Sequence, residues 1–129
     1  MTKNYSIIIP HKDTPDLLQR CLDSIPLRED VEIIVIDDNS SPRKVDFGHF
    51  PKWNGEHFHV FLTKEGKGPG YARNVGLDHA QGRWVVFADA DDFFILVSAK
   101  TIGRWKKQAE ISEEVPAFFV TFVSAIKHE

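Results

Sequence analysis

Three aspartates stand close together directly after a short run of large apolar residues. Trp84 to Phe87 reads WVVF, and Asp89, Asp91 and Asp92 follow it. Like charges at this spacing repel one another and shift each other's pKa unless a cation or hydrogen bonds absorb the charge. Carboxylate oxygens are the ligands that Mg²⁺ and Mn²⁺ prefer, and these ions share coordination with substrate phosphates. The spacing therefore suggests a metal site for a diphosphate, although an isolated pattern of this kind is more typical of a turn.

A second acidic pair follows another apolar run. The segment at 31–36 reads VEIIVI, and Asp37 and Asp38 come directly after it, ahead of a cluster of turn-forming residues. Asp38 could accept hydrogen bonds from a base or a ribose while Asp37 orients the loop. By itself, such a pair is more typical of a turn.

One arginine and one histidine are further candidates for ligand contact. Arg73 lies just inside a predicted helix that follows the glycine-rich segment EGKGPG. There the helix N-terminus favours anions, and a guanidinium can bind a phosphate or a base edge; a plain surface arginine is the alternative. The glycine-rich segment matches neither the P-loop nor the dinucleotide fingerprint. His11 lies at the end of the first predicted strand, and the histidines and the single cysteine show no zinc spacing.

The apolar pattern predicts a strand, a helix and a second strand around the first acidic pair. The run at 5–10 is short and β-branched, as in a strand buried on both faces of a parallel sheet. Thr14 is expected to cap the following helix, with Pro15 in its first turn and Pro26 at its end. The apolar face of this helix is expected to consist of Leu17, Leu18, Cys21, Leu22 and Ile25.

Strands and helices are expected to alternate along the rest of the chain. The predicted elements are, in order, a loop at 43–56, a strand at 58–63, a helix at 71–81 that Gly82 ends, a strand at 84–88, a helix at 98–111 and a strand at 117–124. The inner face of the helix at 71–81 carries small residues that permit close approach to a sheet. They are Ala72, Val75, Gly76 and Ala80.

This alternation indicates an α/β fold, a three-layer, open and mostly parallel sheet. Ligands of such sheets usually lie outside the carboxyl ends of the strands. The first predicted strand ends at Pro10, the second runs into Asp37, and the fourth runs into Asp89. All the acidic clusters are therefore expected on one rim, and this gathering is more informative than any single motif.

Size and composition limit the class of protein. The 129 residues fit one domain spanning 1–129, and a net charge of −3 offers no general basic surface for nucleic acid. Cys21 has no partner for an internal disulfide and no signal segment opens the chain, so we expect a cytoplasmic protein, either free or peripheral at a membrane. The apolar run at 117–126 is far too short for a membrane span.

Four motifs in fixed order resemble the landmarks of one enzyme family. They are SIIIPHKD, IVIDDNSSP, GPGYARNVGLDHAQGRW and VVFADADD, all within residues 5–95. Their order and spacing resemble the family-2 glycosyltransferases, whose GT-A fold is a Rossmann-like sheet that binds nucleotide sugars. The chain departs from the family in its first loop, where Lys12 stands in place of the usual tyrosine and Asp13 in place of the usual asparagine.

The resemblance assigns roles to residues on the predicted rim. It implies that Asp38 recognises the base or the ribose, that Arg73 lies near the base and the diphosphate, and that Asp91 binds Mn²⁺ or Mg²⁺. Asp89 is expected near the ribose, and Asp92 is expected to support the loop. The other expected nucleotide-sugar contacts are Pro10, His11, Asp13 and Ala90.

The reaction implied by the resemblance is transfer of a sugar from a nucleoside-diphosphate sugar to a saccharide or lipid-linked acceptor, with a UDP-sugar as the expected donor. In the family the anomeric centre inverts in a single displacement, the metal stabilises the departing diphosphate, and a carboxylate deprotonates the acceptor. That general base belongs to a later, acceptor-binding half. We therefore expect no catalytic base within this chain, and a role for the protein in cell-surface polysaccharide synthesis.

Three other interpretations stay open at this point. The same fold could bind a nucleotide sugar without catalysis, as an incomplete or inactive fragment. A phosphoacceptor receiver domain also has an acidic pair, a parallel sheet and Mg²⁺, but its pair closes the first strand. A nucleotidyltransferase has similar metal chemistry but usually carries a glycine-rich basic loop after the first strand.

Overall fold

The computed structural model describes residues 3–26, 28–53, 55–92, 104 and 107. The chain divides into two compact units, Met1–Asp91 and Asp92–Glu129. The description below concerns the first unit and the residue that follows it. The helix predicted at 98–111 lies outside the described residues except at Arg104 and Lys107, and the strand predicted at 117–124 lies wholly outside them. The expectation of a single domain over 1–129 stays a prediction.

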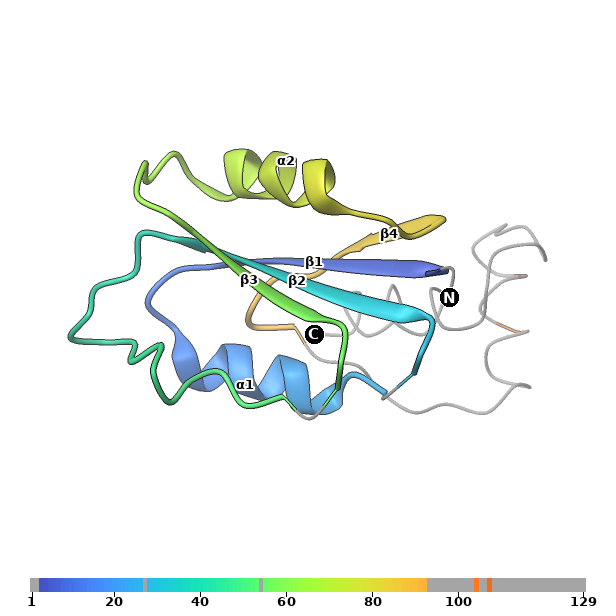
Figure 1. Cartoon of the computed structure of the whole chain (residues 1–129), viewed down its shortest axis with the longest axis horizontal. Coiled ribbons are helices and arrows are strands. Elements are labelled where there is room, and N and C mark those ends of the chain that lie inside the picture. The colour runs from blue at the N-terminus through green and yellow to red at the C-terminus, as the bar shows by residue number, and fades with distance from the viewer. Residues whose placement is uncertain (1–2, 27, 54, 93–103, 105–106, 108–129) are drawn as a thin grey trace. The chain divides into compact units, whose positions relative to one another are not determined.

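The first unit is built on a sheet of four parallel strands in the order β3-β2-β1-β4 (Figure 1). The strands are β1 (Tyr5–His11), β2 (Val31–Asp38), β3 (Phe58–Thr63) and β4 (Trp84–Phe87). The predicted open parallel sheet is therefore confirmed. Both central strands extend further than predicted, so that His11, Asp37 and Asp38 belong to strand ends rather than to loops.

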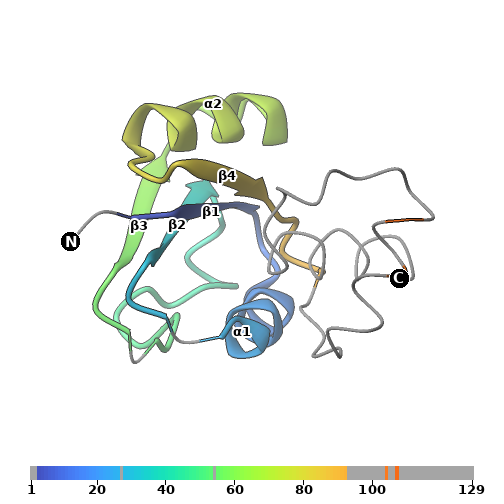
Figure 2. The same cartoon turned by 90° about the vertical axis from the view of Figure 1, so that its right-hand side faces the viewer.

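One helix covers each face of this sheet (Figure 2). Helix α1 (Pro15–Ser24) packs on one face and helix α2 (Pro69–His79) on the other, which confirms the three layers expected of the fold. No helix in the described part of the chain is both long and apolar enough to cross a membrane.

The core lies on both faces of the two central strands. Every residue of β1 and β2 is buried, which explains why these strands read as continuous apolar runs rather than as alternating ones. Under α2, Ile8 and Ile34 pair across the strands and pack with Ile36 and Ala72.

The apolar face of α1 is narrower than predicted. Leu18, Cys21 and Leu22 are fully buried, whereas Leu17 keeps 37% of its surface exposed. Leu17 is therefore not part of the core. The helix ends at Ser24, with Ile25 extended and buried beyond it.

Helix α2 approaches the sheet closely because its inner face is small. A Cβ atom on Gly76 would lie 2.4 Å from Cγ2 of Ile8, and Ala72 is fully buried. The small inner face predicted for this helix is thus confirmed. The helix begins at Pro69 rather than Tyr71, in keeping with the fixed φ of proline in a first turn.

Two expected helix-end signals act differently in the structure. Thr14 occupies the N-cap position, but its side chain makes no capping hydrogen bond; its carbonyl accepts from the Leu18 N–H at 3.0 Å. Gly82 does not end α2, which closes at Ala80. Gly82 instead passes so close to β1 that a Cβ atom would lie 2.6 Å from the Ser6 nitrogen.

Candidate functional site

The parallel topology brings the carboxyl ends of the strands to one rim, which we call the carboxyl rim. It is formed by the ends of β1 at His11, of β2 at Asp38, of β3 at Thr63 and of β4 at Phe87. His11 is the partner of Asp37 and Asp38 is the partner of Thr63 in the sheet register. The expectation that the acidic clusters share one rim is confirmed.

The segment that follows β4 gathers three carboxylates, and we call Asp89–Asp92 the acidic loop. Asp89, Asp91 and Asp92 each offer an oxygen that lies within 4.8 Å of the others. Asp89 and Asp91 are exposed and Asp92 is buried. Carboxylate oxygens at this spacing form a donor set suited to a hard divalent cation.

An ion pair joins two of the predicted site residues from different elements. Nη2 of Arg73, in the second turn of α2, donates to Oδ1 of Asp89 at 3.0 Å. In the described part of the chain, no hydrogen bond reaches the side-chain carboxylate of Asp91. Asp89 is therefore partly neutralised by an arginine, whereas the Asp91 carboxylate stays available to a cation.

A second arginine contacts the same loop and was not found from the sequence. Nη2 of Arg20, in α1, donates to the main-chain oxygen of Asp91 at 2.7 Å. The two residues lie 71 positions apart, and Arg20 sits on a helix whose exposed polar residues carry no motif. Only the position of α1 against one face of the sheet brings them together.

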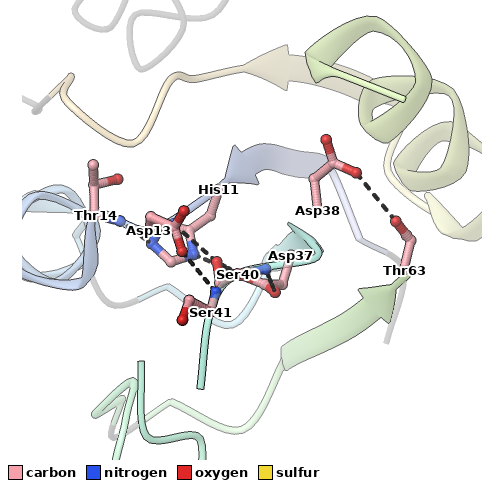
Figure 3. A network of polar contacts seen from close by, with 8 residues as sticks. All are labelled: His11, Asp13, Thr14, Asp37, Asp38, Ser40, Ser41 and Thr63. Atoms are coloured by element: carbon pink, nitrogen blue, oxygen red, sulfur yellow. Dashed lines mark hydrogen bonds and ion pairs between the residues drawn. The ribbon is translucent and has the colours of Figure 1, made fainter. Parts of the chain in front are cut away.

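The Asp38 carboxylate, at the end of β2, accepts hydrogen bonds from two neighbouring segments. Its Oδ1 accepts from Oγ1 of Thr63 at 3.3 Å (Figure 3), and its Oδ2 accepts from the Gly68 N–H at 3.0 Å. Gly68 has φ +91, a conformation that favours glycine. Since each carboxylate oxygen has two lone pairs, Asp38 keeps capacity for a further donor.

A polar network, buried at His11 and Asp37 and partly buried at Ser40, links the loops that follow β1 and β2 (Figure 3). Asp37 is its centre and accepts from His11 Nδ1 at 2.9 Å, from Ser40 Oγ at 2.6 Å and from the Ser40 N–H at 3.0 Å. The Asp13 N–H donates to Ser40 Oγ at 2.9 Å, and the Thr14 N–H donates to His11 Nε2 at 3.1 Å. The two loops are thus held together by His11 and Asp37 at the strand ends and by Ser40 in the second loop.

The electrostatics of Asp37 follow from these contacts. Burial alone would raise the pKa of its carboxyl, but the hydrogen bonds from His11 and Ser40 outweigh burial and lower the pKa below its usual value of 3.8. Asp37 is therefore ionised throughout the neutral range.

The remaining predicted site residues lie at the same rim. Asp13 is partly exposed and adopts a left-handed conformation with φ +57. Pro10 and His11 are buried within β1, and Ala90 is 9% exposed in the acidic loop. A hollow of about 440 Å³ opens beside Asp37 and Thr63 on the β2–β3 side of the rim. Another, of about 280 Å³, lies near Val31, at the amino end of β2 and away from the carboxylates.

Comparison with known proteins gives two findings from sequence. The family model described as Glycosyl transferase family 2 matches residues 6–96. The poly(ribitol-phosphate) beta-glucosyltransferase of Bacillus spizizenii is 34% identical over 105 residues, which cover 78% of this chain and 16% of that protein. The chain therefore spans a small part of the length of this relative.

Two solved structures share the fold. S. aureus TarS 1-349 in complex with UDP-GlcNAc matches with a TM-score of 0.59 at 24% identity, covering 83% of this chain and 32% of that one. The mannosyltransferase PcManGT of Pyrobaculum calidifontis, in complex with GDP-Man and Mn²⁺, matches with a TM-score of 0.58 at 23% identity, covering 74% and 30%. At these identities the likeness concerns the fold alone.

Proposed function

This chain belongs to glycosyl transferase family 2 and has its GT-A sheet, and on that premise we propose that it binds the donor in an enzyme that transfers a sugar from a nucleoside-diphosphate sugar to an acceptor. One observation carries the proposal: within the region matched by the family, Arg73 pairs with Asp89 of the acidic loop, whose carboxylates also include Asp91. A cationic group for a diphosphate thus lies next to carboxylates suited to a metal, and Asp38 lies at the end of β2 on the same rim.

The donor in this proposal is a UDP-sugar. Support comes from TarS, a relative in fold whose structure holds UDP-GlcNAc. The acceptor in the proposal is a saccharide or lipid-linked chain of a cell-surface polysaccharide. The Bacillus relative, named a poly(ribitol-phosphate) beta-glucosyltransferase, supports transfer of a sugar to a polymer. The proposed place of action is the cytoplasm, free or peripheral at the membrane.

Each rim residue has a role in the proposed donor complex. Asp38 accepts a hydrogen bond from the base or ribose, Asp89 accepts from the ribose, and Arg73 binds the diphosphate. Pro10, Asp13 and Ala90 supply main-chain surface around the nucleotide, and His11 lies directly beneath it. The transfer is proposed to invert the anomeric centre, with the general base supplied from outside the described residues.

The acidic loop fits a divalent cation by its chemistry. Its three carboxylates converge, and the exposed Asp91 is the leading ligand. When bound, Mn²⁺ or Mg²⁺ would supply positive charge to stabilise the leaving diphosphate. Mn²⁺ is present in the complex of the mannosyltransferase that shares the fold.

Calorimetry with UDP tests this proposal. We expect the 129-residue chain to bind UDP, and Mn²⁺ to raise the affinity. Asp91→Asn should remove the Mn²⁺-dependent part, about tenfold or more, without changing the fold. Asp78→Asn, which neutralises an exposed aspartate on α2, is the matched control. Metal-independent binding that Asp91→Asn leaves unchanged would refute the assignment of the metal ligand.

A second candidate is a nucleotide-sugar-binding fragment of the same fold without catalysis. The observation that favours it is that Asp37, Asp38 and Asp89 already accept hydrogen bonds or are paired, so none of the three is placed as a free general base. Both candidates predict UDP binding, so turnover of the donor distinguishes them.

A further inference from the structure

His11 is buried between the two loops that carry the proposed nucleotide contacts, and its ring proton can be placed. The Thr14 N–H lies 3.1 Å from His11 Nε2. A main-chain N–H can only donate, so Nε2 is the nitrogen without a hydrogen. The ring proton is therefore on Nδ1, which donates to Oδ1 of Asp37 at 2.9 Å. His11 is a neutral imidazole in the Nδ1–H form.

Ser40 extends this chain of hydrogen bonds with an equally fixed direction. The Asp13 N–H donates to Ser40 Oγ at 2.9 Å, so the hydroxyl hydrogen is free to point to Asp37 Oδ1 at 2.6 Å. The Ser40 N–H donates to the other oxygen of Asp37. Three donors on one side chain suit an ionised carboxylate, which only accepts, and the direction of each hydrogen bond in the network is therefore assigned.

The network fastens the segment at 12–14, which we call the nucleotide loop, at three points. Its N–H groups at Asp13 and Thr14 are bound to Ser40 and His11, and Oδ1 of Asp13 accepts from the Ser41 N–H at 2.7 Å. Asp13 has φ +57, a conformation that non-glycine residues adopt uncommonly. Outside contacts therefore hold this turn.

His11 cannot itself reach a ligand in this arrangement. Its side chain is 0% exposed, and that of Asp37 is 4% exposed. Both ring nitrogens of His11 are already bonded within the chain. Lys12, by contrast, is exposed on the nucleotide loop.

We propose that His11, Asp37 and Ser40 are positioning residues that hold the nucleotide loop in its binding conformation without touching the nucleotide. The inference rests on the proposed function, and it replaces the ligand contact that the sequence suggested for His11. A loop held in its bound shape loses less conformational freedom on binding, which strengthens affinity.

The first test measures UDP affinity by calorimetry in the presence of Mn²⁺. His11→Leu should weaken binding about tenfold, because it removes the buried hydrogen bond to Asp37 and the partly buried one from the Thr14 N–H. His49→Leu is the matched control: His49 Nδ1 also bonds an aspartate, Asp46, at 2.8 Å, but both side chains are exposed. The control should bind UDP like the unchanged chain.

A double-mutant cycle separates positioning from a general loss of stability. If His11 and Ser40 act through one network, His11→Leu combined with Ser40→Ala should weaken UDP binding little more than His11→Leu alone. The pair His49→Leu and Ser40→Ala should be additive. Affinities are compared at a temperature where circular dichroism shows each variant fully folded.

Nitrogen NMR of the imidazole tests the network without any nucleotide. The unchanged chain should show a protonated Nδ1 and an unprotonated Nε2 for His11, with a slowly exchanging Thr14 amide. His11→Gln, which can place an acceptor near the Nε2 position, should keep the Thr14 amide protected, and His11→Asn, which cannot reach it, should not. If His11→Leu fails to fold, the His11→Gln and His11→Asn variants replace it in this test of the network.

The outcomes separate this inference from the proposed function. If the unchanged chain binds UDP and folded His11→Leu binds it equally well, the positioning role is wrong while the proposed function stands. If the unchanged chain does not bind UDP, the proposed function fails. The imidazole spectrum still tests the hydrogen-bond network, because it reports which ring nitrogen of His11 carries the proton. A proton on Nε2, or a direct UDP-induced shift of the ring nitrogens, would overturn the inference.

Discussion

At the scale of single residues, the site depends on which carboxylates are already engaged. Asp37 accepts three hydrogen bonds and Asp38 two, whereas the Asp91 side chain accepts none from the described residues. The sequence shows all of them alike, as aspartates after apolar runs. Only the contacts divide them into supporting residues and residues available to a ligand.

Asp37 gives a prediction about acid stability. Because its folded pKa is lowered, the unfolded chain binds the proton more tightly, and stability is lost as the pH falls from about 3.8 through the lower folded value. At pH 7, Asp37→Asn should lower the free energy of unfolding by about 1–3 kcal/mol, since the amide cannot accept all three hydrogen bonds. The variant should also lose stability less steeply below pH 4.

Urea unfolding between pH 7 and pH 2.5 measures both effects. The Arg28 guanidinium holds the pKa of Asp30 at about 2. Because Asp30 is present in every variant, each variant should still lose some stability at low pH. Asp46→Asn is the control, because the exposed Asp46–His49 pair should contribute little. An Asp37→Asn variant as stable as the unchanged chain at pH 7 would contradict the prediction.

At the scale of elements, glycines and one arginine set the distances between layers. Gly76 lets α2 lie on Ile8, and Gly82 lets the chain pass Ser6 on its way into β4. Arg20 reaches from α1 to the acidic loop. These contacts determine where the helices lie relative to the carboxyl rim.

Gly76→Ala should destabilise the chain. Its Cβ atom would lie 2.4 Å from the side chain of Ile8, which is fully buried, and overpacking of this kind costs about 1–3 kcal/mol. Gly70→Ala is the control on the same helix: its Cβ atom meets nothing within 4 Å, and it should gain up to about 1 kcal/mol of helix stability. Thermal unfolding measures the stability of both variants. If Gly76→Ala were the more stable of the two, α2 would not pack as described.

Arg20→Met should weaken the metal-dependent binding of UDP by about threefold to tenfold, because the loop then loses a charged donor to the Asp91 carbonyl. Binding of UDP without Mn²⁺ should change little. Arg83→Met removes the same charge from an exposed position just before β4, at the far end of that strand from the rim. Calorimetry compares UDP binding by the Arg20→Met and Arg83→Met variants. Equal losses of affinity would mean that only the net charge matters.

The sequence predicts the elements better than the contacts between them. Apolar runs predict the four strands of the described residues, and the small residues at Ala72 and Gly76 predict the close helix. The ends of the predicted strands are enough to predict that the acidic clusters lie on one rim. Arg20 and the His11–Asp37 bond could not be predicted, because they depend on strand register and helix packing across 71 and 26 positions.

At the scale of the whole molecule, the described residues provide a rim for a donor and few groups for catalysis. Asp37 and Asp38 are hydrogen-bonded, Asp89 is paired with Arg73, and Asp91 is the proposed metal ligand. A general base needs a carboxylate that is free to take a proton from an acceptor. The described carboxylates at the rim are each committed to another role.

We therefore expect the 129-residue chain to bind UDP-GlcNAc or UDP-glucose without releasing UDP at a measurable rate. A coupled assay for free UDP, with Mn²⁺ and at donor concentrations that saturate binding, measures this directly. A heat-denatured sample is the baseline. Release of UDP well above that baseline, abolished by Asp91→Asn, would show that one of the rim carboxylates can act as the base.

The ion pair between Arg73 and Asp89 also affects which molecules the rim can discriminate. A ligand that brings only negative charge would draw Arg73 away from Asp89 and offer that carboxylate nothing in exchange, so inorganic phosphate should gain little. In the proposed donor complex, a nucleotide would bring phosphates for the arginine and ribose hydroxyls for the aspartate. The pair should then act as a competitor that a nucleotide displaces more readily than an abundant simple anion does.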